Sequence, residues 1–132
     1  MIQIISVGKL KEKFYVQAFE EYFKRTKKYA KIENIEAKTI NQAFKLAKHD
    51  IVLLDENGKT FTSLKFASFI KDKNLSFIIG PAEGFSDKEK VKAKFKLSLS
   101  SMTYPHELAK VMLMEQVYRA FTILNNLNYH KE

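Results

Sequence analysis

The chain has no cysteine and only four glycines and two prolines among its 132 residues. Without cysteine it can form neither a disulfide nor a thiolate metal site. No apolar run approaches the length that crosses a bilayer, so no membrane partner is expected. Residues 1–7 lack the basic segment and long apolar stretch of a secretion signal. These absences favour a cytoplasmic protein.

The few glycines and prolines are placed in a pattern. Five of the six follow three short apolar runs that are typical of strands: Gly58, Gly80, Pro81, Gly84 and Pro105. In an α/β sheet the ligand crevice lies at the carboxyl ends of the strands, and glycine there lets the backbone turn tightly against a bound molecule. We therefore expect the functional site at residues 54–59, 79–85 and 97–106.

Apolar runs alternate with amphipathic stretches along the chain, which predicts one α/β domain over residues 1–132. This alternation implies a mostly parallel sheet with helices on both faces. Strands are predicted at 3–7, 31–37, 51–55, 76–79 and 95–99, and helices at 14–29, 41–48, 64–71, 87–93 and 107–124. Ser86 with Glu89 three residues later is a capping-box pattern, and Ser63 is a candidate N-cap residue.

The formal net charge is +8, and Arg25 and Arg119 are the only basic residues that are not lysine. An excess of this size favours a polyanionic partner such as RNA, because each neutralised phosphate releases counterions. A coding bias toward lysine would give the same composition, so charge alone leaves both explanations open. The lysines gather around the first helix and at helical spacing near residue 90: Lys9, Lys11, Lys13, Lys24, Lys27, Lys28 and Lys31, then Lys88, Lys92 and Lys96.

The last predicted helix is apolar on almost every side, since Met112 and Ile123 lie opposite its broad apolar face. We expect it to pack against the sheet on one side and against a second subunit on the other. Lys110 interrupts the broad face. Its side chain either extends past the core edge into solvent or directs its ammonium group at the loop just before the helix.

Several segments together form a more specific pattern. They are Leu54-Asp55 with Gly58-Lys59, the glycine-rich segment 77–84, the segment 97–106, the helical segment 115–120, and the ending Tyr129-His130-Lys131-Glu132. In this order and spacing the whole chain resembles the ribosomal large subunit methyltransferase H family of the SPOUT class.

That resemblance implies an S-adenosylmethionine-dependent enzyme that methylates ring nitrogen N3 of a pseudouridine in 23S rRNA of the assembled ribosome. It also implies a SPOUT-type α/β fold with a C-terminal trefoil knot and a homodimer. The cofactor-binding residues carried over from the family are Leu54, Gly80, Leu99, Ser100, Ser101, Met102, Thr103, Tyr104 and Pro105. Leu54 and Leu99 are open to a second interpretation as ordinary core residues at strand ends.

One position departs from the family pattern, because Pro81 stands where many relatives have a second glycine. Proline has no backbone N–H, so it cannot donate a hydrogen bond to the cofactor there. Proline also favours an extended conformation at the preceding Gly80. Pro81 is therefore not among the expected cofactor ligands.

Methyl transfer to an imide nitrogen needs alignment and a group that removes or compensates the N3 proton, and it needs no metal. The candidate catalytic residues are His106, Lys110, Arg119, Tyr129 and His130. His106 directly follows the cofactor loop, and a helix-capping role is its alternative interpretation. For Arg119 the alternative is an ion pair at the surface or the dimer interface.

The distance along the last helix favours a role for the tail in the other subunit. The helix runs roughly 27 Å away from His106, and residues 125–132 span at most roughly 26–29 Å when fully stretched. We therefore predict that Tyr129 and His130 complete the active site of the partner subunit. A frayed terminus is the alternative.

Two other functions stay open from the sequence. The first is a non-catalytic module that binds RNA or ribosomes through its lysines. The second is an α/β enzyme that binds a nucleotide phosphate at residues 80–84, which is disfavoured because no phosphate-binding fingerprint is present and Glu83 is acidic.

Overall fold

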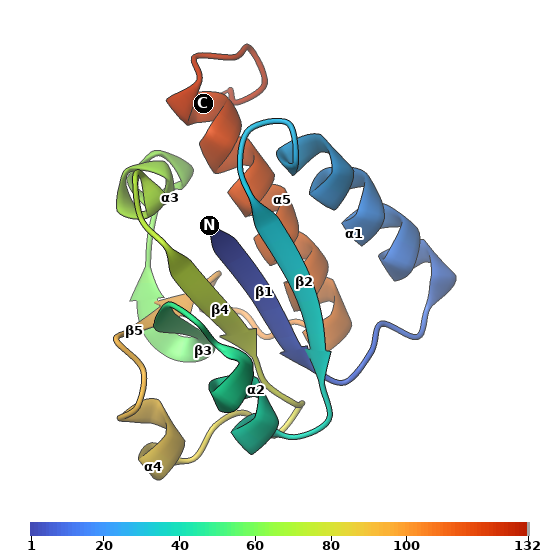
Figure 1. Ribbon diagram of the computed structural model, residues 1–132, viewed down its shortest axis with the longest axis vertical. Coiled ribbons are helices and arrows are strands. Elements are labelled where there is room, and N and C mark those ends of the chain that lie inside the picture. The colour runs from blue at the N-terminus through green and yellow to red at the C-terminus, as the bar shows by residue number, and fades with distance from the viewer. Residues whose placement is uncertain (132) are drawn as a thin grey trace.

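A computed structural model of the chain describes residues 1–131. Five strands alternate with five helices (Figure 1). The strands are β1 (Ile2–Val7), β2 (Ile32–Ala37), β3 (Asp50–Thr60), β4 (Leu75–Ile79) and β5 (Phe95–Ser98). The helices are α1 (Lys13–Thr26), α2 (Ile40–Leu46), α3 (Ser63–Ile70), α4 (Asp87–Lys90) and α5 (His106–Leu124). Each element overlaps the one predicted from periodicity.

The strands form one sheet in the order β2-β1-β4-β3-β5, and every pairing is parallel. The predicted parallel α/β sheet is thereby confirmed. All five residues of β4, a central strand, are buried, as expected for a strand covered on both faces. Parallel pairing brings the carboxyl ends of the strands to the same edge of the sheet, where the glycine-bearing loops begin.

Helices cover both faces of the sheet (Figure 1). The larger core joins one face to α1, α3 and α5, and the smaller core joins the other face to α2 and the segment after β4. Helix α5 packs on the sheet between α1 and α3, so the predicted contact with the sheet is confirmed. Its predicted contact with a second subunit stays a prediction. Among the described residues, no helix combines the length and apolarity needed to span a bilayer.

Strand β3 is longer than predicted because it resumes after an interruption. Leu54 and Lys59 both pair with Leu97 of β5, so residues 55–58 leave the ladder between them. The sequence pattern ended this strand at Asp55, where its apolar run stops. Pairing with β5, which no local pattern reveals, extends the strand to Thr60.

The structure confirms one predicted helix end, the start of α4, and corrects two others, the start of α3 and the end of α4. The capping box of α4 is confirmed, with Ser86 and Glu89 bonded reciprocally. The N-cap residue of α3, however, is Thr62, whose Oγ1 accepts from the Lys65 amide at 3.1 Å. The prediction of Ser63 was wrong, since its hydroxyl donates to Gln116 of α5 at 2.8 Å. Helix α4 ends at Lys90 rather than at the predicted residue 93, because the Lys94 amide donates its hydrogen bond to the Ile51 carbonyl of β3.

Candidate active site

Three loops meet in one pocket: the interruption of β3 and the two loops that follow the carboxyl ends of β4 and β5. The pocket has a volume of about 480 Å³, within the range of small-molecule sites. Its walls come from residues 54–57, 79–85, 98–100 and 102–106, with Lys90 and Ala109. The convergence expected from the placement of glycine and proline is confirmed.

The first loop, residues 55–57, is fixed by contacts of Asp55 at its start and of Gly58 just after its end. Asp55 accepts a hydrogen bond from the Asn57 amide at 3.1 Å and pairs with Lys90 of α4 at 3.3 Å. The Asp55 carboxylate is only 10% exposed, so solvent screens this ion pair less than a surface pair. At Gly58 the chain lies against β5, and a Cβ there would be 2.6 Å from the Lys96 carbonyl oxygen. Glycine is therefore required for this close approach.

The second loop follows β4 and turns at Pro81. The Pro81 carbonyl accepts from the Gly84 amide at 2.9 Å, and Gly84 has a φ of +78°. The Phe85 ring packs over Gly80, so that a Cβ on Gly80 would be 2.7 Å from the ring. Pro81 lines the pocket although it lacks an amide donor.

The third loop, residues 99–105, is shaped by its own hydroxyl groups. Ser98 donates to the Ser100 carbonyl at 2.8 Å, and the Ser100 hydroxyl accepts from the Met102 amide at 3.0 Å. Thr103 donates to Glu56 of the first loop at 3.3 Å. That contact joins the first and third loops across the pocket.

Eight of the nine predicted cofactor residues line this pocket: Leu54, Gly80, Leu99, Ser100, Met102, Thr103, Tyr104 and Pro105. Ser101 is the exception, since it is exposed and absent from the walls. Met102 is 72% exposed and therefore closes the pocket only at its rim.

Sequence reasoning missed Lys90 and Ala109, and it included the acidic groups of the pocket in the expected segments without naming them as cofactor or catalytic residues. Asp55, Glu56 and Glu83 all face the pocket, together with the Phe85 ring. Each lies within four residues of a glycine that the sequence analysis had singled out. Their proximity to those glycines was a signal that the sequence offered. The sequence did not show which side chains point into the pocket.

Of the five candidate catalytic residues, His106 alone lies in the pocket. It is the first residue of α5 and is exposed. Pro105 holds the N-cap position before it. The His106 ring is therefore at the rim of the pocket, beside the third loop.

Lys110 lies one turn further along α5 and is only 2% exposed. Its ammonium group donates to the Ser6 hydroxyl at 2.8 Å and is 4.8 Å from the centre of the Phe19 ring. Both sequence-based interpretations were wrong, because the side chain reaches neither solvent nor the preceding loop but the carboxyl end of β1. Burial lowers the pKa of Lys110.

Comparison with known proteins identifies the family to which this chain belongs. A family model described as a predicted SPOUT methyltransferase matches residues 1–130. A ribosomal RNA large subunit methyltransferase H from Coprothermobacter proteolyticus is 41% identical over 137 residues, which cover 98% of this chain and 99% of the relative. The chain belongs to the ribosomal RNA large subunit methyltransferase H family of SPOUT proteins.

Solved structures of other SPOUT proteins share this fold at low sequence identity. A protein described as a probable methylase from Haemophilus influenzae is 11% identical, with a TM-score of 0.63 over 99% of this chain and 70% of that one. A SpoU methyltransferase from Streptomyces viridochromogenes, solved with AdoMet, is 8% identical, with a TM-score of 0.55 over 97% of this chain and 59% of that one. At such identities the likeness concerns the fold.

In this SPOUT family member, the remaining candidate catalytic residues gather at the other end of α5. Arg119 forms two hydrogen bonds with Glu115, at 2.7 and 3.4 Å. Its Nη1 atom lies 3.1 Å from Nδ1 of His130. The Tyr129 hydroxyl donates to Glu115 at 2.7 Å. We call Glu115, Arg119, Tyr129 and His130 the tail cluster. Glu132, the last residue of the terminal motif, lies outside the described residues.

The tail cluster is electrostatically coupled. The hydrogen bond with Glu115 raises the pKa of Arg119, and burial together with the same carboxylate raises the pKa of Tyr129. Both groups therefore keep their protons at neutral pH. Arg119 is 13 positions after His106, which is about 20 Å along the helix. The candidate catalytic residues thus form two separate groups within one chain.

Proposed function

We propose that the protein transfers a methyl group from S-adenosylmethionine to N3 of a pseudouridine in 23S rRNA of the assembled ribosome. The observation that carries the proposal is the convergence of three loops on one pocket in a chain of this family. Its relatives are named for methylation of large-subunit ribosomal RNA. The net charge of +8 suits an RNA substrate, and a ribosomal substrate implies a cytoplasmic location.

The residues of the pocket fit this methyl donor. Leu54, Leu99 and Ile79 provide apolar walls for an adenine ring, whose polar edge requires backbone donors and acceptors of the kind exposed in loops. The donor carries positive charge on its sulfonium and amino groups. Glu56 and Glu83 give the pocket the complementary negative charge.

When bound, S-adenosylmethionine supplies a methyl group whose bond to sulfur breaks with both electrons remaining on sulfur. The chain's own residues must then take the proton from N3, so that the nitrogen lone pair is free to form the new bond. His106 is suited to this task, because its imidazole lines the pocket and an imidazole nitrogen can act as a general base.

We further propose that the active enzyme is a homodimer whose site is completed by the tail cluster of the second subunit. The separation of about 20 Å between His106 and Arg119 keeps the two groups of one chain apart. Since Tyr129 and Arg119 stay protonated, the tail cluster offers donors and positive charge to an RNA substrate. We assign the role of base to His106, because it is the candidate residue that lines the pocket.

The trefoil knot also belongs to this proposal. Its support is the passage of Gly58 against the backbone of β5, with strand pairing on either side of the interruption in β3. A loop that crosses a neighbouring strand so closely is compatible with threading of the chain.

The deciding experiment is mass spectrometry of 23S rRNA from cells that lack this protein. We expect one N3-methylpseudouridine to be lost and to be restored by purified protein on whole ribosomes but not on free subunits. A non-catalytic RNA-binding module would leave the rRNA masses unchanged, and S-adenosylmethionine would not raise its melting temperature.

Mixed dimers test the shared site. One chain carries His106→Ala and the other carries Tyr129→Phe with His130→Ala, so that each homodimer is inactive. A shared site restores one intact site in the mixed dimer, with up to half of the wild-type activity per dimer. Sites completed within one chain leave the mixed dimer inactive.

A further inference from the structure

Three phenylalanine rings form a continuous aromatic surface beside the pocket. Phe61 follows β3, Phe69 lies in α3 and Phe95 begins β5. Their ring centres are 5.4 Å (Phe61–Phe69), 5.5 Å (Phe61–Phe95) and 4.9 Å (Phe69–Phe95) apart. All three rings are only partly buried. The rings therefore present aromatic surface at the β5 edge of the sheet.

The core holds these rings in place from behind. Phe69 contacts Phe66 at 6.5 Å between ring centres, and Phe66 contacts the fully buried Phe77 of β4 at 6.0 Å. An aromatic ring fixed in this way loses little conformational freedom when a flat ligand stacks on it.

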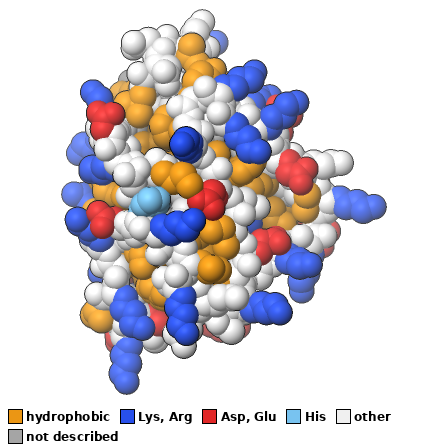
Figure 2. Space-filling view, viewed as in Figure 1, with side chains coloured by type: hydrophobic (Ala, Val, Ile, Leu, Met, Phe, Trp, Pro, Cys, Tyr) orange, Lys and Arg blue, Asp and Glu red, His pale blue; other side chains and the backbone are white. Residues whose placement is uncertain are grey.

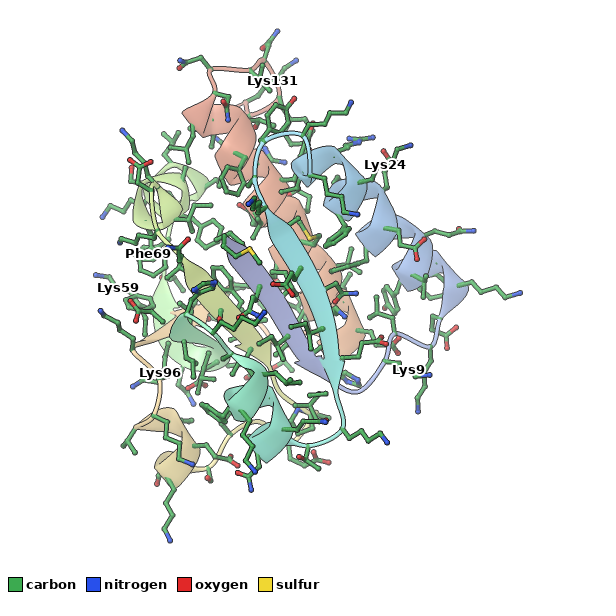
Figure 3. The ribbon with its side chains drawn as sticks, in the orientation of Figure 1. Lys9, Lys24, Lys59, Phe69, Lys96 and Lys131 are labelled. Carbon is green, nitrogen blue, oxygen red and sulfur yellow. The ribbon has the colours of Figure 1, made fainter. Side chains whose placement is uncertain are left out.

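Two lysines lie over the exposed side of the rings. The ammonium of Lys59 is 5.7 Å from the centre of Phe61, and that of Lys73 is 4.6 Å from the centre of Phe69. Lys96, on β5 between Phe95 and Leu97, is exposed. Figure 3 shows Lys59, Phe69 and Lys96 along one side of the molecule, with Lys24 on the opposite side. We call Phe61, Phe69, Phe95, Lys59, Lys73 and Lys96 the β5-edge surface.

Among the described residues, none of Lys59, Lys73 and Lys96 forms an ion pair with an acidic group. Asp50 at the start of β3 is paired with a different lysine, Lys94, at 3.2 Å. Lysine and arginine also cover much of the face seen in Figure 2, with acidic side chains among them. The β5-edge surface combines exposed cations with three partly exposed rings that contact one another.

This surface adjoins the pocket. Lys59 pairs with Leu97, and the next two residues of that chain segment, Ser98 and Leu99, line the pocket. From Phe95 to Ser98 a strand advances about 10 Å. One extended strand of nucleic acid can therefore contact the pocket mouth and the β5-edge surface together.

We propose that the β5-edge surface binds single-stranded RNA next to the target nucleotide, with a base stacked on Phe69 or Phe61 and phosphates near Lys59 and Lys96. The proposal rests on the proposed RNA substrate. Proteins that bind single strands combine a basic track with aromatic rings, because every base has a flat face and every nucleotide a phosphate. The lysines over the rings are exposed, so their side chains can move aside. A base then takes the place of the ammonium group on the face of the ring.

The test measures binding of a fluorescein-labelled 12-nucleotide oligouridine by anisotropy, with full-length protein. Phe69→Leu keeps apolar volume and removes the stacking face, so we expect about fivefold or greater loss of affinity. The matched control is Phe14→Leu, at a ring that is 61% exposed on α1, with less than twofold loss expected.

The lysines are tested by salt dependence. Lys59→Gln with Lys96→Gln should lower the slope of log affinity against log salt by about 1.4, since each single-strand phosphate contact contributes about 0.7. Lys24→Gln with Lys28→Gln removes the same charge elsewhere and should lower it by less than half as much. Equal effects of the two pairs, or unchanged affinity in Phe69→Leu, would overturn the proposal.

Two further measurements keep the outcome unambiguous. Sedimentation identifies a subunit interface, because dissociation of a dimer by Phe69→Leu would assign the surface to a second copy and overturn the proposal. If Phe69→Leu does not fold, photocrosslinking of unmodified protein to 4-thiouridine RNA replaces it. We expect crosslinked peptides that contain Phe61, Phe69 or Phe95, and crosslinks confined to other peptides would refute the inference. Oligouridine binding does not depend on methylation, so failure of the proposed function is recognised separately.

Discussion

Gly58 offers the most direct test of how the pocket is built. A Cβ at this position would lie 2.6 Å from the Lys96 carbonyl oxygen, 2.7 Å from the Lys96 carbonyl carbon and 2.9 Å from that of Leu97. These are backbone atoms of β5, which cannot rotate away as a side chain can. Replacing Gly58 with alanine must therefore displace one of the two strands.

The size of the displacement follows from these distances. Ordinary contact begins near 3.4 Å, so the backbones must separate by about 0.8 Å, which is 3.4 less 2.6. Overpacking of this kind typically costs about 1–3 kcal/mol. For a chain of this length we expect a fall in melting temperature of roughly 4–11 °C. Residues 55–57 precede Gly58 and form one wall of the pocket, so that wall moves with it.

Thermal unfolding with and without S-adenosylmethionine separates the two effects. At saturating cofactor, a tenfold loss of affinity lowers the stabilisation by about 1.4 kcal/mol. We expect Gly58→Ala to lose at least that much. Gly8→Ala is the matched control, since its φ of +97° is strained for alanine but no atom lies within 4 Å of the new Cβ. It should cost about 1–2 kcal/mol and keep the full cofactor-induced shift.

Two results would refute this reasoning. Unchanged melting and cofactor affinity in Gly58→Ala would mean that Gly58 does not lie against β5. An equal loss of affinity in Gly8→Ala would mean that cofactor binding reports overall stability rather than the position of the wall.

Three further outcomes are expected. Ser86→Ala should cost about 1 kcal/mol by removing the capping box of α4, and an unchanged urea midpoint would contradict that role. Tyr129→Phe should cost about 1 kcal/mol through the lost hydrogen bond to Glu115, measured the same way. Lys110 has its pKa lowered by burial, so the unfolded chain binds more protons below the ordinary value of 10.5. Stability conferred by Lys110 must then rise with pH. The difference in unfolding free energy between wild type and Lys110→Met should favour wild type more at pH 9.5 than at pH 7, and a difference independent of pH would show that burial leaves the pKa unchanged.

Local pattern was sufficient for the arrangement of strands and helices, and insufficient for their ends. The capping box at Ser86 was recognised because both partners lie within four residues. Thr62 takes the N-cap position of α3 because Ser63 is bonded to Gln116, a partner 53 residues away. Strand β3 extends beyond its apolar run because its later residues pair with β5.

The candidate site divides in the same way. Leu54, Gly80 and the third loop were predicted from glycine and proline placement and from the family pattern, and they do line one pocket. The contact of Glu56 with Thr103 was not predicted, since it joins residues 47 positions apart. Lys110 was misjudged because its partner Ser6 belongs to the first strand.

The amino-acid sequence alone determined the parallel α/β sheet, the three loops of the pocket and the family, because periodicity, backbone freedom and motif order are properties of neighbouring residues. Only the tertiary structure decided the depth of Lys110, the close passage of Gly58 and the contacts within the tail cluster. Those features depend on contacts between segments far apart in the chain, which form only when the strands and helices pack.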